Sequence, residues 1–62
     1  MKDDTLLDVL GAATRLGCNE RFIRRLVQER RIPFFKVGGS KIRFSSRDLD
    51  LWLDGQRILA RH

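Results

Sequence analysis

The sequence predicts a small α+β domain, mostly α, in the order helix, helix, two-stranded hairpin, helix. Three observations predict it. Apolar residues recur at helical spacing up to about residue 30, the period shortens to two after Pro33, and a capped amphipathic run follows Ser45. The 62 residues fall short of the roughly 100–150 of a usual domain. We therefore expect a single domain over residues 1–62, with its core at about 6–54 and residues 55–62 as a tail or helix extension.

The first helix is expected over about residues 9–16. Apolar residues recur there at helical spacing, at Val9, Ala12, Ala13 and Leu16. Thr5 and Asp8 are candidate N-caps. Gly17 suits the left-handed residue that ends a helix.

The second helix is expected from its N-cap Asn19 to about Arg30. Pro33 forbids its continuation and pushes Ile32 toward extended geometry. Its apolar residues form one stripe: Phe22, Ile23, Leu26 and Val27. Two helices joined by the turn at 17–19 form a helix-turn-helix.

The pair Gly38-Gly39 predicts a hairpin with a two-residue loop. In that register Val37 faces Ser40, Lys36 faces Lys41, Phe35 faces Ile42 and Phe34 faces Arg43. The core face is then Phe35, Val37, Ile42 and Phe44, and the other face carries Lys36, Lys41 and Arg43 beside Phe34. Two opposed lysines are destabilising in isolation, and a hairpin resting on phosphates would tolerate them most readily.

The third helix is expected over 46–54, capped by Ser45 or Ser46. Its buried stripe is Leu49, Trp52 and Leu53. Gly55 weakens or ends it, and Leu59 or Ala60 would extend it. With this helix the architecture is a helix-turn-helix with a wing.

The charge distribution favours an anionic partner. The net charge is +5, yet residues 15–47 hold ten basic and two acidic side chains, a local charge of +8. Ten of the thirteen basic residues are arginine, which makes bidentate contacts to phosphate and guanine. We expect double-stranded DNA. RNA is a weaker candidate, because no exposed aromatic platform is evident beyond Phe34.

Residues suited to catalysis or cofactor binding are scarce. His62, the only histidine, is the last residue, and Cys18 has no histidine near it in the sequence. Asp48, Asp50 and Asp54 fit a solvated acidic face better than a metal site. No run approaches the roughly 20 apolar residues of a membrane span. We expect no enzyme activity, cofactor, metal, small-molecule substrate or membrane partner, and the lone cysteine fits a reducing cytoplasm.

The second helix carries the candidate DNA-reading residues. Arg21, Arg25 and Gln28 share a stripe at i, i+4 and i+7, and a major groove admits one helix. The expected major-groove contacts are Asn19, Arg21, Phe22, Arg25 and Gln28. The expected DNA-backbone contacts are Arg24, Arg30, Arg31, Lys36 and Arg43. The expected wing tip is Gly38, Gly39, Ser40 and Lys41.

Residues 6–54 resemble the excisionase-type, MerR-like winged helix-turn-helix family. The resemblance rests on Leu7-Asp8-Val9, Ala12-Ala13, Leu16-Gly17, the run from Asn19 to Val27, Arg31-Ile32-Pro33, Val37-Gly38-Gly39, Ile42-Arg43-Phe44, Ser46-Arg47-Asp48-Leu49 and Trp52-Leu53. Leu10-Gly11, where polar helix formers are usual, and Phe22, where a small residue is usual, depart from it. The resemblance implies a second helix in the major groove and a wing at the adjacent minor groove or backbone. Free-standing members of this length resemble excisionases, or recombination directionality factors. These proteins bend DNA and help an integrase to excise a phage or mobile element from the nucleoid of a bacterial host.

Alternatives to an excisionase remain open at this point. A small MerR-like transcriptional regulator is the first, and a protein-binding adaptor is the second. If the last helix continues past Gly55, Leu51 and Ile58 lie seven residues apart on a face outside the core. The chain has no heptad segment, so we expect a monomer that associates head to tail on DNA.

Overall fold

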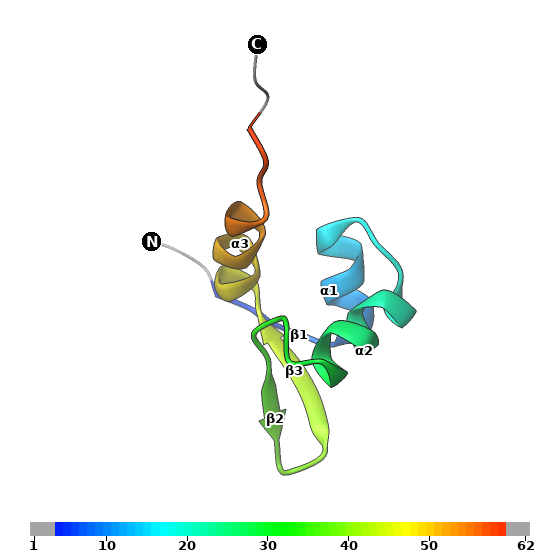
Figure 1. The fold of residues 1–62 in the computed structure, drawn as a ribbon. Coiled ribbons are helices and arrows are strands. Elements are labelled where there is room, and N and C mark those ends of the chain that lie inside the picture. The colour runs from blue at the N-terminus through cyan, green and yellow to red at the C-terminus, as the bar shows by residue number, and fades with distance from the viewer. Residues whose placement is uncertain (1–3, 60–62) are drawn as a thin grey trace.

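A computed structural model describes residues 4–59 and confirms the expected winged helix-turn-helix architecture. In chain order these residues form β1 (Leu6–Leu7), α1 (Val9–Leu16), α2 (Glu20–Gln28), β2 (Phe35–Val37), β3 (Lys41–Ser45) and α3 (Ser46–Gly55). Helices α1 and α2 lie on one side of the base of the hairpin and α3 on the other (Figure 1). The β2–β3 hairpin extends away from the helices, at the end of the molecule opposite to residues 56–59.

The ends of α1 and the start of α2 lie where the sequence predicts them. Asp8 caps α1, with its Oδ1 accepting a hydrogen bond from the Gly11 N–H at 2.8 Å. Gly17 ends α1 in the left-handed conformation, at φ 71°. Asn19 caps α2, with its Oδ1 accepting from the Phe22 N–H at 2.8 Å. Thr5, the other candidate cap for α1, instead donates its N–H to Ser46 Oγ at 2.9 Å.

Helix α2 ends at Gln28, two residues before the predicted end at Arg30. Arg30 has φ 55° and is the one non-glycine residue with positive φ in the described part of the chain. The N–H of Arg30 bonds to the Val27 carbonyl at 3.0 Å, and the N–H of Arg31 bonds to the Leu26 carbonyl at 2.8 Å. These two bonds form the Schellman motif that closes a helix C-terminus, so the chain turns before Pro33 constrains it.

The sheet has the strand order β1-β3-β2, with both pairs antiparallel. β1 was not predicted, because a two-residue strand is too short to show a period. It pairs Leu6 with Ser45 and Leu7 with Phe44. The sheet therefore joins the start of the chain to the strand that leads into α3.

The predicted hairpin register is wrong by one residue. The pairs are Phe35 with Arg43, Lys36 with Ile42 and Val37 with Lys41. Gly38 and Gly39 both have positive φ, as expected for the turn, but Ser40 also belongs to the loop. Three residues therefore separate the paired ends, and a one-residue shift turns β2 over relative to β3.

This register changes both faces of the hairpin. Ile42, Phe44 and Phe34 pack toward the core, while Phe35 and Val37 lie on the opposite face and remain about half exposed, at 48% and 46%. The two lysines do not oppose each other, because Lys36 pairs with Ile42 and Lys41 with Val37. The cost of opposed lysines, predicted from the two-residue loop, is absent from this hairpin.

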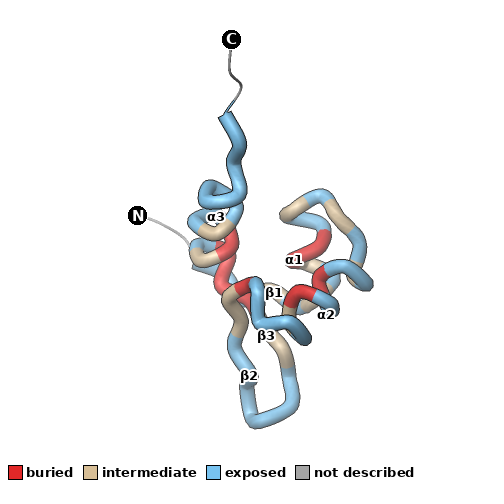
Figure 2. The backbone as a smooth tube through the Cα atoms, in the orientation of Figure 1, coloured by how far each residue is buried: buried red, intermediate tan, exposed pale blue. Residues whose placement is uncertain are grey.

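The core lies where the helices meet the base of the sheet (Figure 2). Its buried residues come from α1, α2, the following loop, β3 and α3: Ala12, Ala13, Ile23, Leu26, Ile32, Phe44 and Leu49. Val27, Cys18 and Trp52 pack against this core while partly buried. Besides Phe35 and Val37, two further expected core residues lie outside it, because Phe22 and Leu53 are each 46% exposed.

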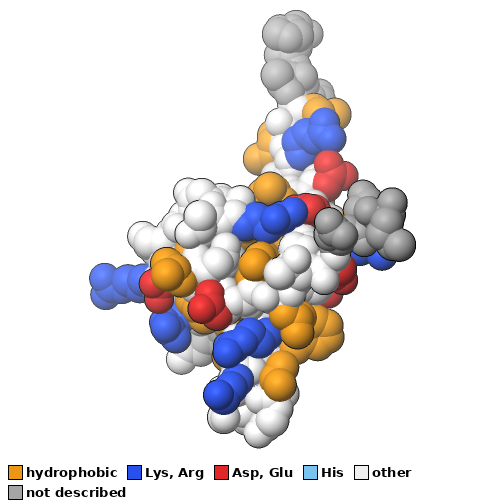
Figure 3. Space-filling model, turned by 180° about the vertical axis from the view of Figure 1, so that it is seen from behind, with side chains coloured by type: hydrophobic (Ala, Val, Ile, Leu, Met, Phe, Trp, Pro, Cys, Tyr) orange, Lys and Arg blue, Asp and Glu red, His pale blue; other side chains and the backbone are white. Residues whose placement is uncertain are grey.

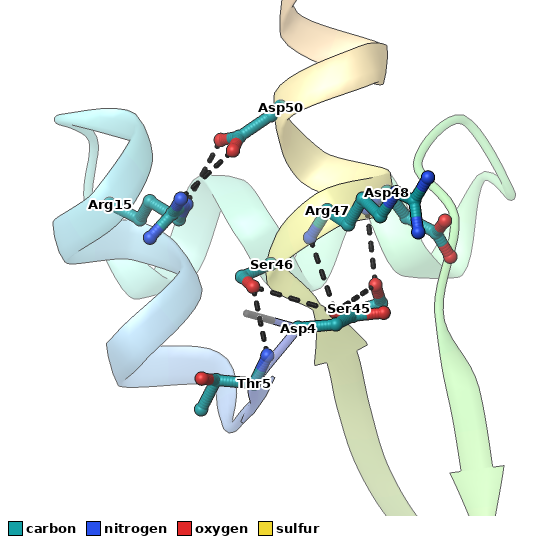
Figure 4. Close-up of polar contacts among 8 residues, drawn as sticks. All are labelled: Asp4, Thr5, Arg15, Ser45, Ser46, Arg47, Asp48 and Asp50. Carbon is teal, nitrogen blue, oxygen red and sulfur yellow. Dashed lines mark hydrogen bonds and ion pairs between the residues drawn. The ribbon is translucent and has the colours of Figure 1, made fainter. Parts of the chain in front are cut away.

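Helix α3 begins at a polar clasp formed with the start of the chain (Figure 4). Ser45 Oγ caps the helix by accepting from the Asp48 N–H at 3.1 Å, and donates to Asp4 Oδ1 at 2.6 Å. The same Asp4 oxygen accepts from the Arg47 N–H at 3.3 Å. These hydrogen bonds, that from Ser45 first, lower the pKa of Asp4. The clasp therefore holds β1 against the start of α3.

The far end of α3 differs slightly from the expectation. The helix runs one residue past the predicted Asp54 to Gly55, and Leu59 is not part of it. Leu51 and Ile58 are exposed, but the helix ends between them, so they do not form the helical stripe considered above. Ala60 and His62 lie outside the described residues.

Candidate nucleic-acid interface

The outward face of α2 is the main feature of the candidate site. Ile23 and Leu26 are buried on its inner side. Arg21, Arg25 and Gln28, the stripe identified from their spacing, are all exposed. A helix of nine residues that stands free along one face has the dimensions of a major-groove reader.

A shallow hollow on this face brings together the expected base-reading residues. Asn19 lies at its start and Phe22, 46% exposed, lies within it. The lining residues are Asn19, Arg21, Phe22, Arg24, Arg25, Gln28 and Glu29. All five expected major-groove residues therefore share one surface, together with one cation and one carboxylate.

Ion pairs engage two arginines of α2, Arg24 and Arg25, and Arg31 just after the helix. Glu20 Oε1 lies 3.5 Å from Arg24 Nη2, one helical turn away. Glu29 accepts from two arginines, with Oε2 3.4 Å from Arg25 Nε and Oε1 3.3 Å from Arg31 Nη1. The bond from Arg31 first, then that from Arg25, lowers the pKa of Glu29. Glu29 is not among the predicted site residues, although it stands four residues after Arg25 in the sequence.

A second hollow connects α2 to the wing. Arg24 lines it from α2, and Lys41 and Arg43 line it from β3. Its other lining residues are Asp8, Val9, Leu10, Glu20, Ser40 and Ile42. One groove is therefore bordered by an expected DNA contact of α2, Arg24, and by three of the wing, Ser40, Lys41 and Arg43. Arg24 borders the hollows on both of its sides.

A model of the helix-turn-helix domain family matches residues 6–57 of this sequence. The chain belongs to this family. The match spans both helices, the wing and α3, so it covers every candidate contact described above, and helix-turn-helix domains of this kind bind DNA. No curated protein and no solved structure matches the chain.

The other residues expected to contact the DNA backbone lie on separate parts of the surface. Arg30 and Arg31 are exposed just after α2. Lys36 is exposed on the opposite face of the hairpin from Lys41 and Arg43, rather than beside them as predicted. Arg43 is half-buried and donates from Nη1 to the Ile42 carbonyl at 2.8 Å.

The outer face of the wing carries apolar side chains that the predicted register placed elsewhere. Leu6, Phe35 and Val37 share this face with Lys41 and Arg43, because their paired residues alternate along β3. All three apolar residues are about half exposed. Figure 3 shows hydrophobic and basic side chains next to one another on the hairpin.

Arg15 is engaged in an ion pair away from α2, and the described residues hold neither a cluster of metal ligands nor a membrane-spanning helix. Arg15, one of the ten central cations, donates from Nε and Nη2 to both carboxylate oxygens of Asp50 at 3.0 and 2.9 Å, and so joins α1 to α3 (Figure 4). Within residues 4–59, no group of three His, Cys, Asp or Glu side chains is placed to hold a metal ion. None of the helices in the same range has the length and apolar character needed to cross a membrane.

Proposed function

We propose that this chain is a sequence-specific double-stranded DNA-binding protein that acts as an excisionase, bending DNA at attachment sites to assist an integrase. The observation that carries the DNA-binding part is the single exposed face of α2, on which all five candidate base readers lie together. The excisionase part is supported by the resemblance of residues 6–54 and by the family, which is associated with excisionase-like DNA-binding proteins.

The side chains on α2 suit the edges of the bases. Arg21 and Arg25 match the O6 and N7 acceptors of guanine, and Gln28 and Asn19 match adenine. Phe22 is apolar and exposed beside them, which suits the methyl group of thymine. With α2 in the major groove, the residues that line its hollow would face the base edges.

The basic residues around α2 suit the phosphates on either side. Arg24, Lys41 and Arg43 border the groove between α2 and the wing, so one strand of the backbone would pass there. Arg30 and Arg31 would contact the backbone at the other end of α2. The wing tip, residues 38–41, and Lys36 would then reach the adjacent minor groove or its phosphates.

Binding to duplex DNA and its salt dependence test the core of this proposal. Selection from a random duplex library gives the preferred sequence, and a salt titration on that duplex follows. With four to six phosphate contacts, log K falls against log salt with a slope of roughly −4 to −5 per monomer. A flat salt response, or a library without an enriched sequence, contradicts sequence-specific DNA binding.

The genomic target separates excision from transcriptional regulation. A small MerR-like regulator would contact DNA with the same α2 and wing. Footprinting on the DNA that flanks the chain's own gene distinguishes the two: protection at an attachment site beside an integrase gene supports excision. Protection at a promoter alone supports regulation and contradicts the excisionase role.

We also propose that the protein associates head to tail on DNA. The half-exposed apolar face of the wing, Leu6, Phe35 and Val37, and the exposed Leu51 and Leu53 of α3 are the candidate contact surfaces. The tip of the hairpin and the C-terminal end of α3 lie at opposite ends of the molecule, which suits an open chain of copies (Figure 1).

Sedimentation of the free protein and binding isotherms on one, two and three tandem sites test this association. A monomer without DNA and increasing affinity per site on tandem DNA are expected. A stable dimer without DNA, or independent binding to tandem sites, contradicts it.

A further inference from the structure

The hollow on α2 is lined by three arginines and by one carboxylate, that of Glu29. Glu29 sits directly after α2, where its N–H bonds to the Arg25 carbonyl at 2.9 Å. Its side chain lines the hollow on α2 and bonds to Arg25 on one side and Arg31 on the other, at 3.4 and 3.3 Å. A negative charge at this place weakens binding to a polyanion. Its presence is therefore best explained by an effect on the two arginines to which it bonds.

We propose that Glu29 is a positioning residue that sets DNA specificity by orienting Arg25 toward the bases. This inference rests on the proposed DNA-binding function and deepens it. Glu29 engages the Nε atom of Arg25, which leaves the terminal end of the guanidinium for the paired acceptors of guanine. The bond to Arg31 fixes the carboxylate from its other side.

The same contacts reduce binding to the wrong sequence. On a duplex without the preferred base, a free arginine gains energy by swinging to a phosphate, which every sequence offers. Glu29 competes with the phosphate for Arg25 and repels the backbone through its own charge. On the preferred duplex, Arg25 is already ordered, so less side-chain entropy is lost on binding.

The Glu20–Arg24 pair provides a matched control on the same helix. It also joins a glutamate and an arginine four residues apart, at 3.5 Å, with similar exposure of the carboxylate, 44% against 42% for Glu29. Arg24 lies to the side of the α2 stripe and borders the groove that leads to the wing. Neutralising Glu20 therefore removes the same charge without affecting the base-reading arginine.

The test compares Glu29→Gln with Glu20→Gln on two duplexes. One duplex is the sequence enriched from a random library by the unmodified chain, and the other is a shuffled duplex of equal composition. E20Q is expected to raise the affinity for both duplexes by a similar factor, about two- to threefold, through the loss of one negative charge. E29Q removes the same charge, so the affinity for the shuffled duplex is expected to rise by a similar factor. On the preferred duplex this gain is offset by the cost of ordering Arg25, one long side chain, so the preferred-to-shuffled ratio falls about three- to tenfold.

A second comparison tests whether Glu29 acts through Arg25. In the background of Arg25→Ala, E29Q should leave the preferred-to-shuffled ratio unchanged, because no arginine remains to be oriented. Circular dichroism checks that each variant is folded. The inference is overturned if E29Q and E20Q change the ratio equally, or if E29Q still lowers it without Arg25. If the library yields no enriched sequence, the proposed function and this inference fail together.

Discussion

Replacing Arg30 by glycine should stabilise the fold and weaken DNA binding at the same time. Arg30 holds the left-handed conformation, at φ 55°, that closes α2. A side chain there costs about 1–2 kcal/mol relative to the right-handed conformation. Glycine removes this cost, but it also makes the unfolded chain more flexible, which lowers the free energy of unfolding by about 0.4–1 kcal/mol. Glycine is therefore expected to raise the free energy of unfolding by about 0.5–1 kcal/mol, or the melting temperature by about 3–6 °C.

The binding measurement is expected to move in the opposite direction. If Arg30 contacts a phosphate, its loss makes the slope of log K against log salt shallower by about 0.9. Thermal unfolding followed by circular dichroism and salt titrations on the preferred duplex give the two quantities. A rise in stability together with a loss of affinity would show that Arg30 is unfavourable for folding and favourable for binding.

Two control variants separate the backbone from the charge. Arg30→Ala removes the charge and keeps the left-handed strain, so we expect the same loss of salt slope with little gain in stability. Gly17→Ala introduces the same kind of strain at φ 71°, where an added Cβ would meet no heavy atom within 4 Å. It should lower the free energy of unfolding by about 1 kcal/mol. An unchanged melting temperature for R30G would refute the strain argument, and unchanged salt slopes for both Arg30 variants would refute the phosphate contact.

Three further predictions test other parts of the molecule. Arg25→Ala should lower the binding free energy on the preferred duplex by about 1–3 kcal/mol and relax specificity. Lys41→Ala should weaken binding to all duplexes alike. An equal loss of affinity on all sequences for Arg25→Ala would contradict its proposed role as a base reader. Asp4→Asn should lower the melting temperature at neutral pH. Because folding lowers the pKa of Asp4, its contribution is fully present above the unfolded-state pKa and is lost as pH falls through the lower folded-state pKa. The melting temperatures of the unmodified and variant chains should therefore converge only in acid below the ordinary pKa of an aspartate. Arg15→Ala should also lower the melting temperature by breaking the bond to Asp50, and molar salt should remove most of the difference; a difference that persists in high salt would indicate lost packing instead.

The helix boundaries could be predicted because short polar side chains and glycine mark them. Asp8, Asn19 and Ser45 each accept a backbone N–H three residues further on, a local geometry that depends little on the rest of the fold. Gly17 ends α1 for an equally local reason. The end of α2 was missed because arginine, unlike glycine, gives no sign in the sequence that it adopts positive φ.

The hairpin register could not be predicted from Gly38-Gly39 alone. Two glycines permit a two-residue loop, but they do not exclude Ser40 from the loop. The choice decides which side chains of β2 face the core: Phe34 packs against it, while Phe35 and Val37 are about half exposed. The predicted faces of β3 agree with the structure, since Ile42 and Phe44 face the core, so the error concerns β2 alone.

The candidate site was partly predictable for the same reasons. The stripe of Arg21, Arg25 and Gln28 follows from helical periodicity, which one helix determines by itself. Lys36 was placed on the wrong face of the wing because its position depends on the register. The spacing of Glu29 from Arg25 is visible in the sequence, but its second bond, to Arg31, depends on the turn that closes α2 at Arg30.

The contact between Trp52 and Arg31 gives the molecule a built-in optical reporter. The indole Nε1–H of Trp52 on α3 donates to the Arg31 carbonyl at 2.8 Å, in the segment that leads from α2 to the wing. Trp52 is the only tryptophan in the sequence, so its fluorescence comes from one place. A rearrangement that moves Arg31 relative to α3 would break this hydrogen bond and change the polarity around the indole. Intrinsic emission can therefore follow movement of this segment relative to α3 in real time, without an attached dye.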